Sequence, residues 1–420
     1  MASRHVSRVA AALAGALALA ACAADGDAGA APLGPTVVAD ASSPPATRSP
    51  SATRTPRRAR CGWPETCTSR SPHRSPSMAR PPRGWAANGR TAMSRRCRVR
   101  RTSRRLTRGE DGVWELTTAV PAGLWNYGFV TRECSLILVC SVDADPANPP
   151  TLAAAADATQ AWSQVFVPVD SAHPTYDAAT QIPVAAAERG TVSRVDDPDI
   201  GVYLPAGYDP ERAEPYPVLV LSHGAGDDET AWFTQGGAAE QLDHAIATGA
   251  LEPTVVVTTD FTGLSAEGME DPDFFTLYAT HLRTTVLPYA HERLHASADP
   301  DERAFAGLSM GGRLAEHLLL NEPGLFATYG MWSMPTAVRN VPAAALTDTQ
   351  RDNAATASAI HLGTGAQDPL TPSPSQVDDL AAAYEDTGVR TTTLETDGGH
   401  AWWVWRIMLA DFLATTAFSD

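Results

Sequence analysis

Residues 303–312 read RAFAGLSMGG, an apolar run that ends in a turn of glycine and serine. Residues 303–308 have the length and apolar character of a buried strand, and residues 311–321 have the pattern of a helix. Between them, residues 307–311 match G-x-S-x-G, in which a serine stands on a sharp strand-to-helix turn. Backbone passes close to such a turn, so glycines are needed. The stretch predicts that Ser309 is a nucleophile; a turn without a role is the alternative.

A serine hydroxyl becomes a good nucleophile only when a base takes its proton. Three histidines follow Ser309 in the chain. His317 is expected on the helix after the turn, facing away, and His361 inside an apolar strand, where histidines are usually packed. His400 follows two glycines in a loop near the C-terminus. It is therefore the predicted base.

The acid that orients the base is expected between the serine and the histidine, the order used by this kind of turn. Asp368 alone follows directly on a predicted strand, in residues 363–369 (GTGAQDP). Such a position lies at the carboxyl edge of a parallel sheet, where catalytic loops gather. Asp368 is the predicted acid and Asp397 the second choice. The alternative for Asp368 is a turn former before Pro369.

An oxyanion needs hydrogen-bond donors that are already in place. Residues 216–222 (YPVLVLS) are a predicted buried strand, and the loop after them reads HGAGDD. The backbone N–H groups of Ala225 and Met310 are the predicted donors. His223 is either catalytic or an organiser of this loop, and the second role is favoured.

From about residue 161 onward, strand patterns alternate with helix patterns. Such alternation predicts an α/β fold with a mostly parallel sheet covered on both faces. The hydrolytic domain is expected to span residues 151–420.

Together, the motifs resemble carbohydrate esterase family 1, the feruloyl esterases, whose relatives include enterochelin esterases and mycolyltransferases. They are His223-Gly224-Ala225-Gly226, Trp232-Phe233, Gly307-Leu308-Ser309-Met310-Gly311-Gly312, and Gly398-Gly399-His400 with Trp405. The resemblance spans residues 190–416 and implies an α/β-hydrolase that cleaves esters through an acyl-enzyme, without metal or cofactor. Expected substrates are feruloyl or acetyl esters of carbohydrates. The resemblance also implies that Trp232 and Trp405 contact the substrate, although both could equally be core or rim. The alternatives are a siderophore ester, or a surface binding protein that has lost activity.

The first 22 residues are typical of a bacterial lipoprotein signal. Arg4 and Arg8 precede an apolar run over residues 9–21, and Cys22 follows small residues. The run is too short to span a bilayer and fits a signal peptide. We expect export and lipidation of Cys22 as a surface anchor and sole membrane contact. An ordinary signal peptide with an incidental cysteine is the alternative.

Charge divides the chain. The 420 residues carry a formal charge of −16 and no lysine; residues 46–108 hold 18 arginines and one acid, whereas residues 109–420 hold 12 arginines and 44 acids. The acidic balance argues against nucleic acid as a partner. Residues 23–108 have no apolar periodicity and are predicted to be disordered. They are interpreted as out-of-frame sequence, a basic arm for anionic polymers, or a linker.

Residues 109–150 show strand alternation at 113–120 and again at 124–130. They predict a hairpin and resemble the late strands of an immunoglobulin-like module related to family-48 carbohydrate-binding modules. The early strands of such a sandwich are not visible in the sequence, so the predicted module is partial. The cysteine spacings do not suggest a zinc site.

Overall fold

The structure is a computed structural model that describes residues 106–108, 110, 114–117, 123–130, 142–150, 152, 162–167, 179–335, 346–370 and 374–418. All of them belong to one compact unit within residues 34–420. The predicted signal peptide with Cys22, and residues 23–105, lie outside the described residues. Among the helices of the described part, none is long and apolar enough to cross a bilayer.

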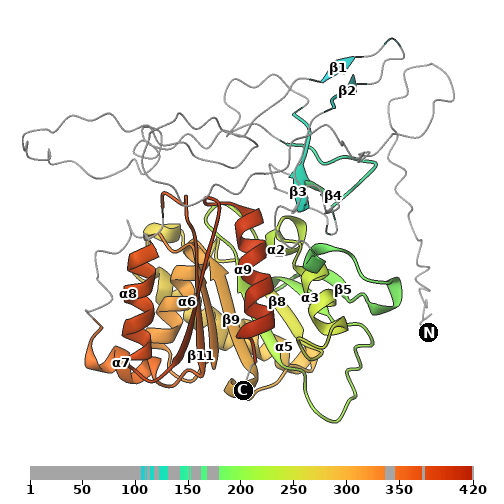
Figure 1. The fold of residues 1–420 in the computed structure, drawn as a ribbon. Helices are drawn as coiled ribbons and strands as arrows, with labels where there is room; N and C mark the ends of the chain where they lie inside the picture. Colours follow the sequence, from blue (N-terminus) through green and yellow to red (C-terminus); the bar gives the residue numbers. More distant parts are fainter. Residues whose placement is uncertain are drawn as a thin grey trace, which may run out of the picture. The chain divides into compact units, whose positions relative to one another are not determined.

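An eight-stranded sheet forms the centre of the molecule (Figure 1). Its strands in spatial order are β12 (Arg390–Thr396), β11 (Ala359–Gly365), β10 (Thr328–Trp332), β9 (Arg303–Leu308), β7 (Val218–Ser222), β8 (Val255–Thr259), β6 (Asp199–Leu204) and β5 (Thr191–Asp196). From β12 to β8 every neighbouring pair is parallel, and β6 and β5 are antiparallel additions at one side. The predicted α/β-hydrolase fold with a mostly parallel sheet is confirmed.

Helices cover both faces of this sheet, and α9 runs along one of them in Figure 1. The helices are α2 (Ala231–Thr234), α3 (Ala238–Ala247), α4 (Phe274–His281), α5 (Leu287–Leu294), α6 (Met310–Asn321), α7 (Asp348–Ala354), α8 (Pro374–Glu385) and α9 (Trp402–Thr415). A π-helical turn, Leu282–Val286, joins α4 to α5, and Pro288 lies in the first turn of α5.

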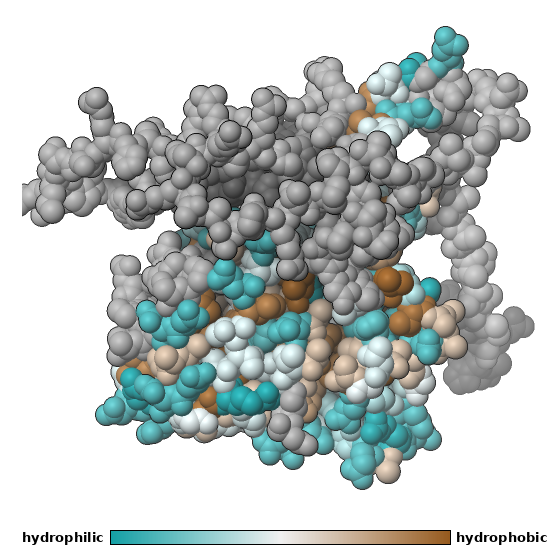
Figure 2. Space-filling view, viewed as in Figure 1, coloured by the Kyte–Doolittle hydropathy of each residue, from teal (hydrophilic) through white to brown (hydrophobic). Residues whose placement is uncertain are grey.

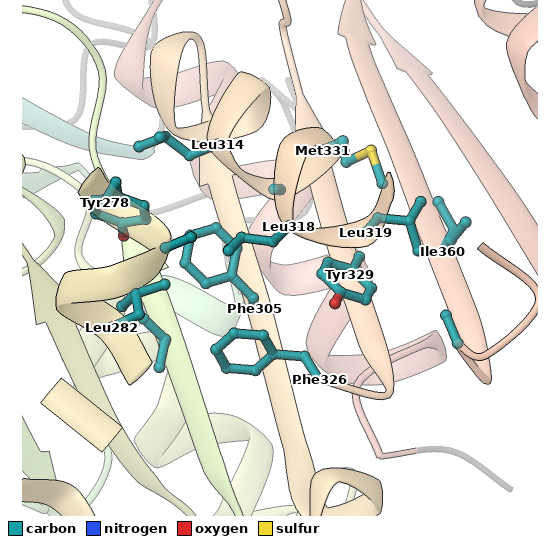
Figure 3. Close-up of a cluster of buried hydrophobic side chains, with 14 of the residues drawn as sticks. Tyr278, Leu282, Phe305, Leu314, Leu318, Leu319, Phe326, Tyr329, Met331 and Ile360 are labelled. Atoms are coloured by element: carbon teal, nitrogen blue, oxygen red, sulfur yellow. The ribbon is translucent and has the colours of Figure 1, made fainter. Parts of the chain in front are cut away.

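Two apolar cores follow from alternation along the central strands. In β7, Val218 and Val220 point into one core and Leu219 and Leu221 into the other, because successive side chains of a strand face opposite ways. The first core, between the sheet and α4–α8, is drawn in Figure 3. The second lies against α3 and α9. Strands buried on both faces explain the nearly continuous apolar sequence of β7 and β8.

On the surface, hydrophilic and apolar residues are interspersed over the visible face of the hydrolase domain (Figure 2). Among the described residues, Trp114 and Leu116 are large apolar side chains that remain exposed. Both precede the hydrolase sheet in the chain.

The strands before the hydrolase sheet pair differently from the prediction. β2 (Trp114–Glu115) pairs with β1 (Thr107–Arg108), and β3 (Gly123–Tyr127) pairs with β4 (Ser163–Val167), both antiparallel. The predicted hairpin between residues 113–120 and 124–130 is therefore wrong in the described residues. β4 lies beyond residue 150, the predicted domain boundary. It pairs with β3, which lies before that boundary, and not with the large sheet.

Buried Arg406 of α9 joins β3 to the hydrolase helices. Its guanidinium donates to the carbonyl oxygen of Leu124, to Oδ1 of Asn126 at 2.8 Å, and, through Nε, to the carbonyl oxygen of Gln235 at 2.9 Å. A buried guanidinium requires such acceptors. The β3–β4 pair is therefore packed as part of the hydrolase domain.

Candidate active site

Ser309 stands on a strained turn at the carboxyl end of β9. It directly precedes α6 and has φ 52° and ψ −112°, a conformation that L-residues rarely adopt. A Cβ added to Gly307 would lie 2.4 Å from the backbone of Gly311, and one added to Gly311 would lie 2.4 Å from the Ser222 carbonyl oxygen. Both glycines of the motif are thus required by close backbone approach, as the sequence predicts.

His400 and Asp368 are brought together from two different loops. Asp368 follows β11, and His400 lies between β12 and α9. Nδ1 of His400 lies 2.8 Å from Oδ2 of Asp368, whose side chain is fully buried. A carboxylate only accepts, so Nδ1 carries a proton and Nε2 of the neutral ring is left as a base. Asp397, the second choice from sequence, is exposed and not the partner of His400.

Parallel register places these residues at one edge of the sheet. Leu308 is level with Trp332, and Trp332 is level with Gly363. The N–H of Ser309 donates to the Trp332 carbonyl oxygen at 2.8 Å. The N–H of Gln367, beside Asp368, donates to the carbonyl oxygen of Gly398 at 2.8 Å, which ties the two loops together. The carboxyl edge of a parallel sheet is where catalytic groups of α/β proteins collect.

The loop after β7 lies against the serine. A Cβ added to Gly224 would lie 3.2 Å from Cβ of Ser309, and the N–H of Gly311 donates to the His223 carbonyl oxygen at 3.0 Å. Ala225, next in the loop, is exposed. Met310 is the first residue of α6, so its N–H belongs to the first turn, where helical acceptors are lacking. Both predicted oxyanion donors therefore come from segments that adjoin Ser309.

His223 is buried beneath this loop, with both ring nitrogens engaged. Nδ1 lies 2.7 Å from the Gly224 carbonyl oxygen and Nε2 lies 3.0 Å from Oδ1 of Asp260. The ring stacks on Phe261 at 4.2 Å between centroids. No nitrogen is left to take a proton from Ser309. Asp260 is not among the residues predicted from sequence, although it directly follows the buried strand β8 at the same sheet edge.

Of the two predicted substrate contacts, Trp232 is corrected. Its side chain has no exposed surface and packs edge-on against Trp332 and Trp402 in the second core, because all four residues of α2 are buried. Trp405 is 5% exposed and meets the His400 ring edge-on at 4.9 Å. It therefore packs beside the predicted base.

The two remaining histidines lie away from this arrangement. His317 stacks on Phe275 at 5.3 Å along α6. His361 is buried in β11, between Trp332 and Asp411. Within the described residues, no cluster of three or more histidine, cysteine or acidic side chains is arranged to hold a metal ion.

Known proteins resemble parts of this chain. An endo-1,4-beta-xylanase/feruloyl esterase from Xylanibacter ruminicola is 35% identical over 151 residues, which are 33% of this chain and 20% of that protein. An uncharacterized protein from Corynebacterium glutamicum is 26% identical over 257 residues, 56% of this chain and 60% of its own. This chain thus spans a fifth of the first relative's length and three fifths of the second's.

Two solved structures resemble the fold. A feruloyl esterase module from Clostridium thermocellum has a TM-score of 0.46 and 22% identity over 58% of this chain and 93% of its own. The enterobactin esterase from Shigella flexneri has a TM-score of 0.43 and 18% identity over 65% and 69%. The family model Esterase, described as "Putative esterase", matches residues 194–416, more than half of the chain. The chain therefore belongs to the Esterase family, carboxylic ester hydrolases of the α/β-hydrolase fold.

Proposed function

We propose that the protein is a serine carboxylic ester hydrolase with Ser309 as nucleophile, His400 as base and Asp368 as the acid that orients the base. The contact between Nδ1 of His400 and Asp368, 2.8 Å long and at the same sheet edge as the strained Ser309, carries this proposal. It leaves Nε2 as the nitrogen available to the serine.

In the first half-reaction, Oγ of Ser309 attacks the ester carbonyl carbon while Nε2 of His400 takes the hydroxyl proton. The carbonyl oxygen becomes an oxyanion, to which the N–H groups of Ala225 and Met310 donate hydrogen bonds. The bond to the alcohol oxygen then breaks, and His400 gives its proton to the departing alcohol. Water, deprotonated by His400, then attacks the carbonyl carbon of the acyl-enzyme. The bond to Oγ of Ser309 breaks, His400 returns the proton to Oγ, and the acid is released. Asp368 keeps the imidazole in the required tautomer throughout.

The proposed substrates are feruloyl or acetyl esters of carbohydrates. The similarity of one third of the chain to a xylanase/feruloyl esterase supports this class. The charge near the site supports it as well. Asp227 lies in the loop beside Ser309, and exposed Asp397 precedes the glycines before His400. An acidic rim disfavours an anionic substrate such as an iron-loaded catecholate siderophore.

The test is hydrolysis by the full chain of methyl ferulate, acetylated xylan, p-nitrophenyl acetate and a catecholate siderophore. We expect turnover of methyl ferulate or acetylated xylan, and loss of several orders of magnitude in kcat in Ser309→Ala. Preferential turnover of the siderophore would instead favour a siderophore esterase. Labelling by a fluorophosphonate probe is expected in the wild type alone; labelling that persists in Ser309→Ala would refute the assigned nucleophile.

A chain that folds, binds carbohydrate and hydrolyses none of the four esters would instead fit the binding-protein alternative. Asp397→Asn is a matched control for the acid. It removes an exposed carboxylate close to His400 without touching the Asp368 contact. We expect its kcat to stay within about twofold of the wild type.

A further inference from the structure

His223 is held between a carbonyl oxygen and a carboxyl group, which also only accepts hydrogen bonds when it is ionised. Its Nδ1 faces the Gly224 carbonyl oxygen at 2.7 Å, and its Nε2 faces the Asp260 carboxyl group at 3.0 Å. The ring is fully buried, so water does not complete either contact. A neutral imidazole has one N–H and can satisfy one acceptor; only the doubly protonated ring donates to both. The geometry therefore requires an additional proton, on His223 or on Asp260.

The surroundings of Asp260 decide where that proton resides. The backbone N–H of Thr262 donates to Oδ1 at 2.8 Å, and the Thr262 hydroxyl contacts Oδ2. Hydrogen bonds donated to a carboxylate stabilise its charged form. Asp260 is therefore the carboxylate and His223 the imidazolium.

A second histidine–aspartate pair, in which the histidine is buried and the aspartate is partly exposed, shows the opposite state. Nδ1 of His361 accepts from the indole N–H of Trp332 at 2.8 Å, and Nε2 lies 2.9 Å from Asp411. An indole N–H cannot accept, so Nδ1 of His361 has no proton and the ring is neutral. The difference between the two pairs lies in what faces Nδ1: a donor at His361 and a carbonyl oxygen at His223.

The acceptor at Nδ1 of His223 belongs to the peptide group whose N–H is that of Ala225. In a trans peptide the C=O and N–H are coplanar and point in opposite directions. Holding the Gly224 oxygen thus fixes the direction of the Ala225 N–H. A charged donor also polarises the peptide group and strengthens that N–H as a donor in turn.

We propose that His223 is a positioning residue. As a buried imidazolium held by Asp260, it fixes and polarises the Gly224–Ala225 peptide group, so that the Ala225 N–H donates a hydrogen bond to the oxyanion. This inference rests on the proposed function for its catalytic consequence. The charged pair itself rests on the contacts of the ring and of the Asp260 carboxylate, and not on catalysis.

Charges around the pair agree with this state. Burial alone would lower the pKa of His223, but the hydrogen bond and charge of Asp260, with a contribution from Asp227, raise it above its ordinary value. From α4, His281 is near enough to feel Asp260, and burial lowers the pKa of His281. Tyr278 of α4 also feels Asp260, and burial raises its pKa. Neither side chain is charged at neutral pH, so Asp260 and Asp227 remain the charges that act on His223.

Asp260→Asn removes the charge and keeps the contacts. Oδ1 accepts from both His223 and the Thr262 N–H, so the asparagine oxygen can occupy that place. Its amide then faces only the Thr262 hydroxyl, which can turn to accept. The matched control is Asp411→Asn, which neutralises the partner of the other buried histidine.

The first measurement is ¹⁵N NMR of the full chain with labelled histidine across pH, with the His223 signal assigned by its loss in His223→Gln. We expect both ring nitrogens of His223 to be protonated at pH 7.5 in the wild type. In Asp260→Asn we expect the pKa to fall by about one to three units. An unprotonated ring nitrogen in the wild type at that pH would overturn the proposal, with or without a folded variant.

The second measurement is the pH profile of ester hydrolysis. We expect Asp260→Asn to lower kcat by about tenfold at pH 8 with KM within about twofold, and to approach the wild type as pH falls and His223 regains its charge. Asp411→Asn should stay within about twofold throughout. Equal kcat in Asp260→Asn and wild type would overturn the positioning role. A wild type that hydrolyses no ester would refute the proposed function, while the NMR titration still tests the charged pair.

Discussion

The carboxylate of Asp368 is held on both oxygens: Oδ2 lies 2.8 Å from Nδ1 of His400, and Oδ1 accepts the Leu370 N–H at 3.0 Å. In Asp368→Asn, the Leu370 N–H still needs an oxygen, so the new amide nitrogen must face His400. A donor there forces the imidazole proton onto Nε2, where it blocks the base. We expect kcat to fall by about three to four orders of magnitude. Steady-state kinetics check this, and a loss below tenfold would contradict the tautomer argument.

The strained backbone of Ser309 predicts a difference between two inactive variants. Its φ of 52° and ψ of −112° favour glycine. Ser309→Gly should therefore be more stable than Ser309→Ala by about 1–2 kcal/mol. Urea unfolding of both variants measures the difference. Neither variant has a hydroxyl at this position, so catalysis plays no part in the comparison. Equal stability of the two variants would show that the turn at Ser309 is unstrained.

The two tryptophans assigned to substrate from the sequence should behave differently from each other. Trp232 has no exposed surface, whereas Trp405 meets His400 edge-on. Trp232→Ala is expected to lower the free energy of unfolding by about 3–5 kcal/mol because it empties core volume. Trp405→Phe keeps most of the apolar volume, so we expect it to lower kcat while the free energy of unfolding changes little. Thermal unfolding and kinetics on both variants check this, and a normal kcat in Trp405→Phe would contradict a role beside the base.

Stability should depend on pH through His223 and Asp260. The pKa of His223 is raised above its ordinary 6.5, so its contribution is complete below about pH 6.5 and is lost as pH rises through the folded value. Burial would raise the pKa of Asp260, but the contact with His223 lowers it below 3.8. Its contribution is present above about pH 4 and is lost as pH falls through the folded value.

The destabilisation caused by Asp260→Asn should therefore be largest between about pH 4 and pH 6.5, and should shrink on either side. Within that window we expect it to be about 1–3 kcal/mol. Urea unfolding of wild type and variant at a series of pH values measures it. A difference that does not change with pH would contradict the ion pair.

Buried Arg406 predicts that the strands before the hydrolase sheet stabilise it. A chain shortened to residues 168–418 lacks β3 and β4 and leaves the guanidinium without Leu124 and Asn126. We expect it to be less stable than the full chain by about 3 kcal/mol. Arg406→Met should destabilise the full chain but stabilise the shortened one, because only there is the charge short of acceptors. The same sign in both chains would contradict the packing of β3 on α9.

The sequence was informative where local geometry and chemistry coincide. The glycines of residues 307–311 indicate a tight turn, because a side chain at Gly307 or Gly311 would clash with backbone. Asp368 lies just after β11, and a residue after a parallel strand lies at the carboxyl edge of the sheet. His400 was chosen because few histidines follow Ser309, and the structure places its Nδ1 2.8 Å from Asp368. Each of these inferences needs only the order of elements along the chain.

What the sequence did not reveal depends on pairing between distant segments. The partner of β3 is β4, far along the chain, and alternation in residues 113–130 does not specify that pairing. Trp232 was misplaced because the same indole suits a pocket wall and a core. Arg406 lies in the apolar sequence of α9, and its acceptors on β3 cannot be deduced from its neighbours.

Trp332 connects the core to the nucleophile within a single residue. Its carbonyl oxygen receives the Ser309 N–H, while its indole lies among Trp232, His361 and Phe412. We therefore expect substitutions that repack the core around this indole to shift the backbone that holds Ser309. In a directed-evolution experiment, substitutions around Trp332 should therefore change the melting temperature and kcat together. Libraries that target the second core would need to be screened for both.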